Sequence, residues 1–341
     1  MFFTHDDLSA VRRFYSSQAD APATPLHRLA GLAARLGLNE ILLKDESHRF
    51  GLPAFKILGT RYAVARLRDR GPLGDLACAT AGNHGRAVAR AARLAGLTAH
   101  VYVPRGTAPA RIAAIQDEGA HVVQPDADYD DCVRLMARDA GARGWTIVSD
   151  TAWPGYEQVP KWIMGGYTWL LEEAARDWGA APPDVVIVQA GVGSLAGAVA
   201  GWLEATLGAA RPRLVVVEPH GSACVAASLR AGRRVSLERT EPTPMAGLRC
   251  AEVSPLAWPM LARRVDVAVQ IGEDDARRAM DALARPVQDD PAVVAGASGA
   301  AGLAGLMRLV RDPALAGARK SLGLTPARRV LVINTEGPTD R

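Results

Sequence analysis

Short apolar runs alternate with helix-like segments along the whole chain, and this alternation limits the fold more strongly than any other feature. The intervening segments, such as residues 87–94 and 131–140, carry apolar residues three and four positions apart, as amphipathic helices do. Strands that alternate with helices favour an α/β fold whose mostly parallel sheets are covered by helices. The expected strands are residues 41–46, 99–104, 121–125, 146–150, 185–190, 214–219 and 329–335.

The length of 341 residues exceeds that of an average domain, so we expect two lobes. A compact series of strand and helix units occupies the middle of the chain. We predict that residues 1–55 and 151–341 form a larger lobe and that residues 56–150 form a smaller inserted lobe. A site between the two lobes is the expected place for chemistry.

Composition and charge exclude several classes of protein. Hydrophobic residues make up 49% of the chain and charged residues 22%, as in ordinary globular proteins. The net charge is +4, but the arginines are scattered among acids, which argues against nucleic-acid binding. No apolar run is long enough for a membrane helix and no leader pattern is seen, so a cytoplasmic protein is expected. The widely spaced cysteines, which predict free thiols and no metal site, are Cys78, Cys132, Cys224 and Cys250.

One lysine stands out because it ends a loop that follows a predicted strand. The chain has only four lysines, and Lys56 follows the apolar pair Ala54 and Phe55 immediately before a predicted helix. An amine in a partly apolar pocket is readily neutralised and becomes nucleophilic. Lys56 is therefore a candidate catalytic residue, although most single lysines are surface residues.

A tight turn before the next helix is the second candidate element. The turn has glycines on both sides of an Asn-His pair, and its backbone N–H groups are expected to face a ligand at a helix N-terminus. Such a turn suits a carboxylate, although an ordinary helix cap explains it equally well when it is taken alone. The residues of this candidate substrate site are Thr80, Ala81, Gly82, Asn83 and His84.

A glycine loop between a strand and a helix is the third candidate, and it is suited to phosphate. The residues of this loop are Gly191, Val192, Gly193, Ser194 and Leu195. The same segment satisfies the dinucleotide pattern, with Glu218 at the end of the following strand as a possible ribose ligand. A nicotinamide-dependent oxidoreductase therefore stays open, but that function explains neither the Lys56 segment nor the Asn83 turn.

Together these segments resemble the fold-type II pyridoxal-phosphate enzymes, in particular the diaminopropionate ammonia-lyases. The resemblance spans nearly the whole chain and implies a two-lobed fold of the tryptophan synthase β type. Its most specific parts are the SDTAW run and the TEGPTD ending. The segments that carry it are KDESHRFGLPAFKILG (44–59), ATAGNHG (79–85), SDTAWPGYEQVPKWIMGGY (149–167), QAGVGSLAGAV (189–199), TPMAGLRC (243–250), PLAW (255–258) and NTEGPTD (334–340).

The resemblance implies pyridoxal 5'-phosphate as the cofactor and assigns roles to several residues. Lys56 would hold the cofactor as a Schiff base, Asn83 would contact its ring oxygen, and the loop 191–195 would bind its phosphate. Thr335 would face the pyridine nitrogen. A neutral hydroxyl does not keep that nitrogen protonated, which favours early loss of a β-substituent.

The implied reaction is α,β-elimination on a small β-substituted amino acid such as 2,3-diaminopropionate, giving pyruvate and ammonia. Lys56 would remove the α-proton, and Asp150 would keep a departing amine protonated. The chain departs from the family pattern at Ala81 and Ala297, where an aspartate and a glutamate are common, and this weakens the expectation of activity on the D-enantiomer.

Three alternatives remain open. Within the same fold, the chain can be a serine or threonine dehydratase or a β-replacement synthase. A sensor that retains the cofactor without catalysis is another, and the oxidoreductase described above is the third. A homodimer is expected because closed two-fold assemblies are the commonest oligomers.

Overall fold

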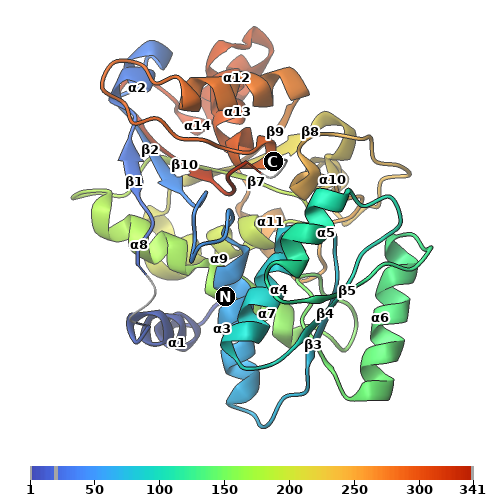
Figure 1. Cartoon of the computed structure of the whole chain (residues 1–341). Coiled ribbons are helices and arrows are strands. Elements are labelled where there is room, and N and C mark those ends of the chain that lie inside the picture. Colours follow the sequence, from blue (N-terminus) through green and yellow to red (C-terminus); the bar gives the residue numbers. More distant parts are fainter. Residues whose placement is uncertain (1, 19–21, 339–341) are drawn as a thin grey trace.

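The ten strands of the computed structural model, which describes residues 2–18 and 22–338, form two separate sheets (Figure 1). The larger sheet has six strands in the order β1-β2-β10-β7-β8-β9, and the smaller has four in the order β5-β4-β3-β6. β1 is antiparallel to β2, and every other neighbouring pair is parallel. The predicted α/β class with mostly parallel sheets is therefore confirmed.

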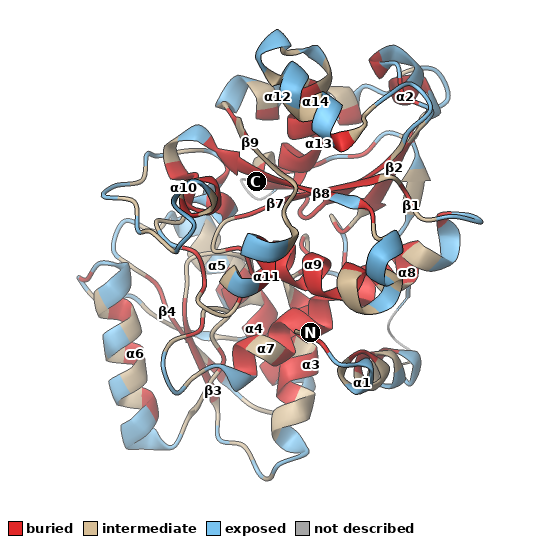
Figure 2. Cartoon of the chain, turned by 180° about the vertical axis from the view of Figure 1, so that it is seen from behind, coloured by how far each residue is buried: buried red, intermediate tan, exposed pale blue. Residues whose placement is uncertain are grey.

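Helices cover both faces of the six-stranded sheet because its side chains alternate between two apolar cores. Val185 and Ile187 of β7 belong to one buried cluster, while Val186 and Val188 belong to the other. Figure 2 shows the inner strands β7 and β8 buried along most of their length, whereas the edge strands β1 and β9 are more exposed. The strands of this sheet are β1 (Leu26–Arg28), β2 (Glu40–Asp45), β7 (Val185–Gln189), β8 (Arg213–Pro219), β9 (Val267–Ile271) and β10 (Arg329–Asn334).

The two helical layers come from different parts of the chain. One core cluster joins the sheet to α2 (Ala30–Leu36), α12 (Glu273–Ala284), α13 (Ala297–Arg311) and α14 (Ala316–Leu322). The other joins it to α1 (His5–Ser16), α3 (Lys56–Arg68), α7 (Gln158–Tyr167), α8 (Trp169–Asp177), α9 (Ser194–Leu207), α10 (Cys224–Ala231) and α11 (Trp258–Arg264).

The smaller sheet is built entirely from the middle of the chain. Its strands are β3 (Leu76–Ala79), β4 (Ala99–Tyr102), β5 (His121–Val123) and β6 (Thr146–Ile147). On one face Ala77 and Ala79 pack against α6 (Tyr129–Arg143). On the other, Leu76 and Cys78 belong to the cluster that contains α4 (Asn83–Leu94) and Ile115 of α5 (Pro109–Gln116). α3 packs against both α4 and α7 and so connects the two sheets.

Each predicted apolar run contains a strand, but the structure adds three strands that the runs do not include. These are β1, β3 and β9, which have three, four and five residues. Length is not the reason, since β5 and β6 are as short; β1 is mostly polar, β3 is rich in alanine and β9 is interrupted by Gln270, so none of them stands out as an apolar run. The run at 146–150 is a strand only over Thr146–Ile147, because its last residues enter the site. No helix of the described residues is both long and apolar enough to cross a membrane.

Candidate active site

The loop that leads from β2 to Lys56 is anchored by a buried network of charges. Arg49 donates to Glu46 at 2.8 Å and 2.6 Å, and to Glu173 of α8 at 2.8 Å and 2.6 Å. Lys44 also donates to Glu173, at 2.6 Å, and all four side chains are almost completely buried. Two cations are thereby balanced by two anions, which avoids the large cost of an unpaired buried charge.

The end of the same loop pairs with the segment that follows β10. The Phe55 amide donates to the Thr335 carbonyl at 3.2 Å, and the Gly337 amide donates to the Pro53 carbonyl at 2.9 Å. An isolated antiparallel bridge joins Ala54 and Glu336. Lys56, the first residue of α3, is therefore held close to the C-terminal motif.

Lys56 forms an ion pair with Asp150. Its Nζ donates to Asp150 Oδ2 at 2.5 Å, and Nδ1 of His84 lies 3.7 Å from the same oxygen. Burial raises the pKa of Asp150, but His84 and Lys56 outweigh this and hold that pKa well below its ordinary value. Burial lowers the pKa of Lys56, and Asp150 reverses the effect, so that this pKa is raised. Both groups are therefore charged at neutral pH.

The surroundings of the ion pair are aromatic and hydrogen-bonded. Lys56 Nζ lies 5.4 Å from the ring centre of Phe55 and 5.8 Å from that of Tyr167. His84 Nε2 lies 2.8 Å from the Val148 carbonyl, which can only accept, so this nitrogen carries the proton. Burial lowers the pKa of His84, and the charge of Asp150 partly offsets this. The bond to Val148 thus fixes the histidine ring beside Asp150.

The turn from Thr80 to His84 offers backbone donors beside this pair. Thr80 Oγ1 accepts from the Gly82 amide at 3.4 Å. Among the described residues, the amides of Ala81, Asn83 and His84 have no acceptor. These donors lie at the N-terminus of α4, where a carboxylate is favoured by the helix dipole.

The glycine loop presents a longer row of backbone donors. Within the described part of the chain, none of the five amides from Gly191 to Leu195 donates to a protein acceptor. Gly193, with φ of 88°, precedes α9, and a Cβ there would lie 2.7 Å from Leu261 Cδ1. Ser194 Oγ donates to the Asp150 carbonyl at 3.1 Å, so the loop and the ion pair adjoin. Unpaired amides at a helix N-terminus suit a phosphate.

Hydrogen bonding within the protein leaves the hydroxyl hydrogen of Thr335 free for a ligand. Gln189 Nε2 donates to Thr335 Oγ1 at 2.9 Å and lies within 3.2 Å of the carbonyls of Ser298, Gly299 and Ile333. Because carbonyls only accept, this amide cannot be turned around, and Thr335 Oγ1 acts as the acceptor in this contact. Its own hydrogen is then available for an acceptor in the site.

Asn83 meets a buried acid that the sequence interpretation did not single out. Its Nδ2 donates to Glu336 Oε2 at 2.6 Å. Burial raises the pKa of Glu336, and hydrogen bonds from Ser298 and Asn83 partly offset this. Glu336 and Gln189 both lie inside segments that carry the family resemblance, so the motifs contained the signal, but their contacts depend on the fold.

Glu218 has a structural role that makes it unsuitable as a ribose ligand. It is fully buried and accepts the amides of Val225 and Ala226 at 2.7 Å and 2.8 Å, at the start of α10. Both carboxylate oxygens are therefore used by the protein. The oxidoreductase alternative loses the acid on which it depended.

The buried Glu218 also predicts a dependence of stability on pH. Burial raises its pKa from 4.5 to about 7. Between these values the folded state binds a proton that the unfolded state has lost, so the free energy of unfolding decreases as pH rises. Between pH 5 and pH 8, the free energy of unfolding measured by denaturant titration should decrease by about 1–3 kcal/mol less in Glu218→Gln than in wild type. Parallel pH profiles for the two proteins would contradict this assignment.

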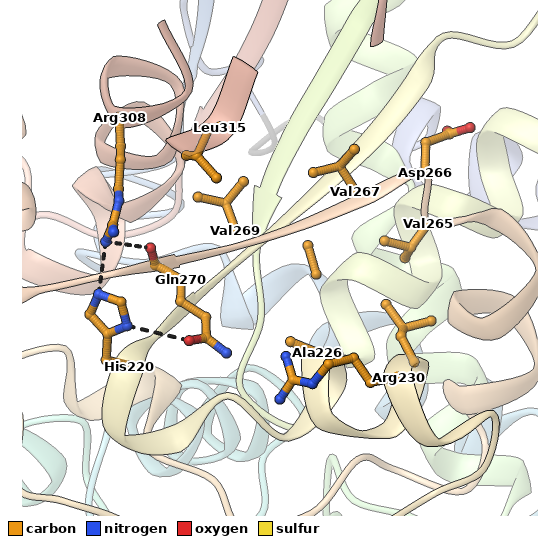
Figure 3. Close-up of a pocket in the computed structure, with 12 residues that line it drawn as sticks. His220, Ala226, Arg230, Val265, Asp266, Val267, Val269, Gln270, Arg308 and Leu315 are labelled. Carbon is orange, nitrogen blue, oxygen red and sulfur yellow. Dashed lines mark hydrogen bonds between the residues drawn. The ribbon is translucent and has the colours of Figure 1, made fainter. Parts of the chain in front are cut away.

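A groove of about 700 Å³ lies elsewhere, beside the edge strand β9 (Figure 3). His220 accepts from Arg308 at 2.7 Å on one side of it, and Arg230 of α10 lies on the other. None of the predicted site residues lines this groove. Over residues 2–18 and 22–338, no group of three or more His, Cys, Asp and Glu side chains is arranged to hold a metal ion.

The structure thus brings the Lys56 loop, the turn 80–84, the glycine loop 191–195 and the C-terminal motif together. The arrangement fits pyridoxal phosphate: an amine for covalent attachment, unpaired amides for the phosphate, and a hydroxyl donor beside them. Fold and site define an enzyme of fold type II that uses this cofactor. Residues 19–335 match the family model described as pyridoxal-phosphate dependent enzyme, and the chain belongs to this family.

Relatives with a named activity indicate the type of reaction within this family. Diaminopropionate ammonia-lyase of Escherichia coli K12 is 38% identical, over 99% of this chain and 90% of the relative. The enzyme of the same name from Salmonella typhimurium is 38% identical, over 96% of this chain and 88% of that relative. The crystal structure of the E. coli enzyme with an aminoacrylate-PLP azomethine intermediate has a TM-score of 0.91 and 38% identity, over 99% and 90% of the two chains. The protein is therefore a pyridoxal-phosphate-dependent lyase.

Maize serine racemase shares the fold, with a TM-score of 0.83 at 23% identity over 100% of this chain and 95% of that one.

Proposed function

We propose that this enzyme eliminates ammonia from L-2,3-diaminopropionate and yields pyruvate and a second ammonia. The observation that supports this most strongly is the Lys56–Asp150 ion pair, which adjoins the glycine loop through Ser194. An amine for the α-proton and a carboxylate for a second ammonium are then available side by side. The 38% identity to diaminopropionate ammonia-lyases supports the same substrate.

The cofactor would be held by residues from every part of the site. Lys56 would bind it covalently, the amides of residues 191–195 would bind its phosphate, Asn83 would contact its ring oxygen, and Thr335 its ring nitrogen. When bound, pyridoxal phosphate supplies an electron sink for negative charge at the substrate α-carbon. Thr335 would donate to the ring nitrogen, since Gln189 donates to its oxygen, and this would leave that nitrogen unprotonated.

Two side chains of the site would handle the α-proton and the proton on the departing nitrogen. Lys56 Nζ would take the α-proton of the bound substrate. Asp150, which is ionised at neutral pH, holds the β-ammonium by charge and keeps the departing nitrogen protonated. The free amides of Ala81, Asn83 and His84 bind the substrate carboxylate.

The stoichiometry of ammonia tests this function. Purified holoenzyme with L-2,3-diaminopropionate should release two ammonia molecules for each pyruvate, because the aminoacrylate product hydrolyses to pyruvate and ammonia. With L-serine, elimination would release one ammonia for each pyruvate. A kcat/KM at least about tenfold higher for L-serine or L-threonine would favour the dehydratase alternative, and turnover only with an added thiol or other nucleophile would favour a β-replacement synthase.

The organisation of the protein is a further part of the proposal. We propose residues 56–150 as the smaller inserted lobe, which is supported by the sheet formed from β3 to β6. A homodimer is supported by the general prevalence of two-fold assemblies, and a cytoplasmic location by four free cysteines. Light scattering that gave the mass of one chain at micromolar concentration would contradict the dimer.

A further inference from the structure

Two polar side chains from distant parts of the chain meet inside the site. Asn83 begins α4, beside the four-stranded sheet, and Glu336 follows β10 of the six-stranded sheet. They are 253 positions apart in sequence, and the distance from Nδ2 to Oε2 is 2.6 Å. Glu336 is only 7% exposed. This contact joins the two sheets directly at the residue proposed to meet the cofactor ring.

The acid in this contact is held rigidly. Its backbone forms a bridge with Ala54, and its carbonyl accepts from the Gly296 amide at 2.9 Å. Its carboxylate accepts from Asn83 and lies beside Ser298 at the N-terminus of α13, where the helix dipole favours a negative charge. Glu336 is therefore a fixed acceptor, to which the amide of Asn83 must adapt.

A fixed carboxylate determines which way the amide of Asn83 faces. Oxygen and nitrogen of an asparagine amide have nearly the same shape, so hydrogen bonding decides its orientation. The carboxyl oxygen of Glu336 accepts in this contact, which turns Nδ2 toward Glu336 and leaves the second Nδ2 hydrogen for another acceptor. With the reverse orientation, Oδ1 would face a cofactor oxygen, and the two acceptors would repel each other.

We propose that Glu336 is a positioning residue that orients the amide of Asn83 so that it donates to the ring oxygen of pyridoxal phosphate. The inference rests on the proposed function, because it assumes that Asn83 contacts this oxygen. If this is so, Glu336 affects the affinity for the cofactor only when Asn83 is present.

A double-mutant cycle on cofactor binding tests this dependence. The apoprotein is titrated with pyridoxal phosphate, and the dissociation constant is measured by tryptophan fluorescence and visible absorbance. Asn83→Ala should weaken binding about tenfold, the value of one good hydrogen bond. Glu336→Ala should weaken it similarly, and the double variant should remain about tenfold weaker than wild type. Glu336→Gln, which keeps an acceptor oxygen, should stay within about threefold of wild type.

Matched controls separate this effect from a general loss of stability. Glu118 is also buried, at 6%, and bonds to Arg90 of α4 at 2.5 Å and 3.1 Å without contacting Asn83. Glu118→Gln should lower the melting temperature but leave the dissociation constant unchanged. If Glu336→Ala does not fold, Glu336→Met provides nearly the same volume without an acceptor.

Two results would overturn the inference while leaving the proposed reaction intact. The first is wild-type affinity in Glu336→Ala or Glu336→Met. The second is a double variant about a hundredfold weaker than wild type, since additive losses mean that Glu336 acts independently of Asn83. Wild-type affinity in Asn83→Ala would instead refute the cofactor contact of Asn83, and the inference with it. Lyase activity is judged separately, by the ammonia assay.

Discussion

Replacement of Lys56 by alanine is expected to reduce pyruvate formation from L-2,3-diaminopropionate by about 10⁴-fold or more. The reason is that, in the proposed reaction, one side chain would have two functions, as the covalent anchor of the cofactor and as the base for the α-proton. No neighbouring amine can replace it. The nearest charged partner of Lys56 is Asp150, at 2.5 Å, and Lys44 is fully buried in the ion network of Arg49.

Borohydride reduction of the holoenzyme identifies the lysine directly. The visible absorption band should disappear, and peptide mapping should find the cofactor fixed on Lys56. A label on Lys44 or Lys161 would refute the assignment. Lys161→Ala is the matched control, because Lys161 pairs with Asp7 at 3.3 Å, is partly exposed, and should keep wild-type activity.

A preference for the L-enantiomer of about 10²–10⁴-fold in kcat/KM is the second large effect that we expect. The α-proton must leave perpendicular to the plane of the cofactor, so the two enantiomers need bases on opposite sides. Lys56 can serve only one side. At the position where relatives of this pattern commonly carry an aspartate, this chain has Ala81, whose methyl group cannot accept a proton.

Pyruvate formation from each enantiomer measures this preference, and variants identify its cause. Ala81→Asp should raise the rate on the D-form without a comparable gain on the L-form. Equal wild-type rates on the two enantiomers would refute the idea unless Asp150 serves as the missing base. Asp150→Asn decides between these cases, because it should then abolish the rate on the D-form selectively.

The local elements of the site could be predicted from the sequence because each depends on residues close together in the chain. A lysine at the end of a strand-to-helix loop, a glycine loop before α9 and a turn before α4 are short patterns with a direct backbone consequence. Their combination also indicated the family, and the comparisons confirm it. Three strands were not recognised, because β1 is mostly polar, β3 is rich in alanine and β9 is interrupted by Gln270, so that none forms an apolar run.

The pairings between these elements could not be predicted in the same way. Asp150 was expected to meet only the substrate, whereas the structure places it against Lys56, 94 positions away in sequence. Glu218 matched a ribose-binding acid in the sequence, but two amides of α10 occupy its carboxylate. Whether a polar residue is free for a ligand or used by the protein depends on neighbours that are distant in the chain.

The α/β class could be predicted from the sequence because hydrophobic periodicity acts over a few residues, and the resemblance to a family indicated the cofactor. Lys56 and the loop 191–195 remain predictions of that resemblance. The tertiary contacts added that Lys56 pairs with Asp150, that Gln189 donates to Thr335, and that Glu336 meets Asn83. These contacts arise where strands distant in sequence become neighbours in a sheet, as β2 and β10 do, and where α3 connects the two sheets. No local pattern encodes strand order, so the orientation of the donors and acceptors in the site depends on the complete fold.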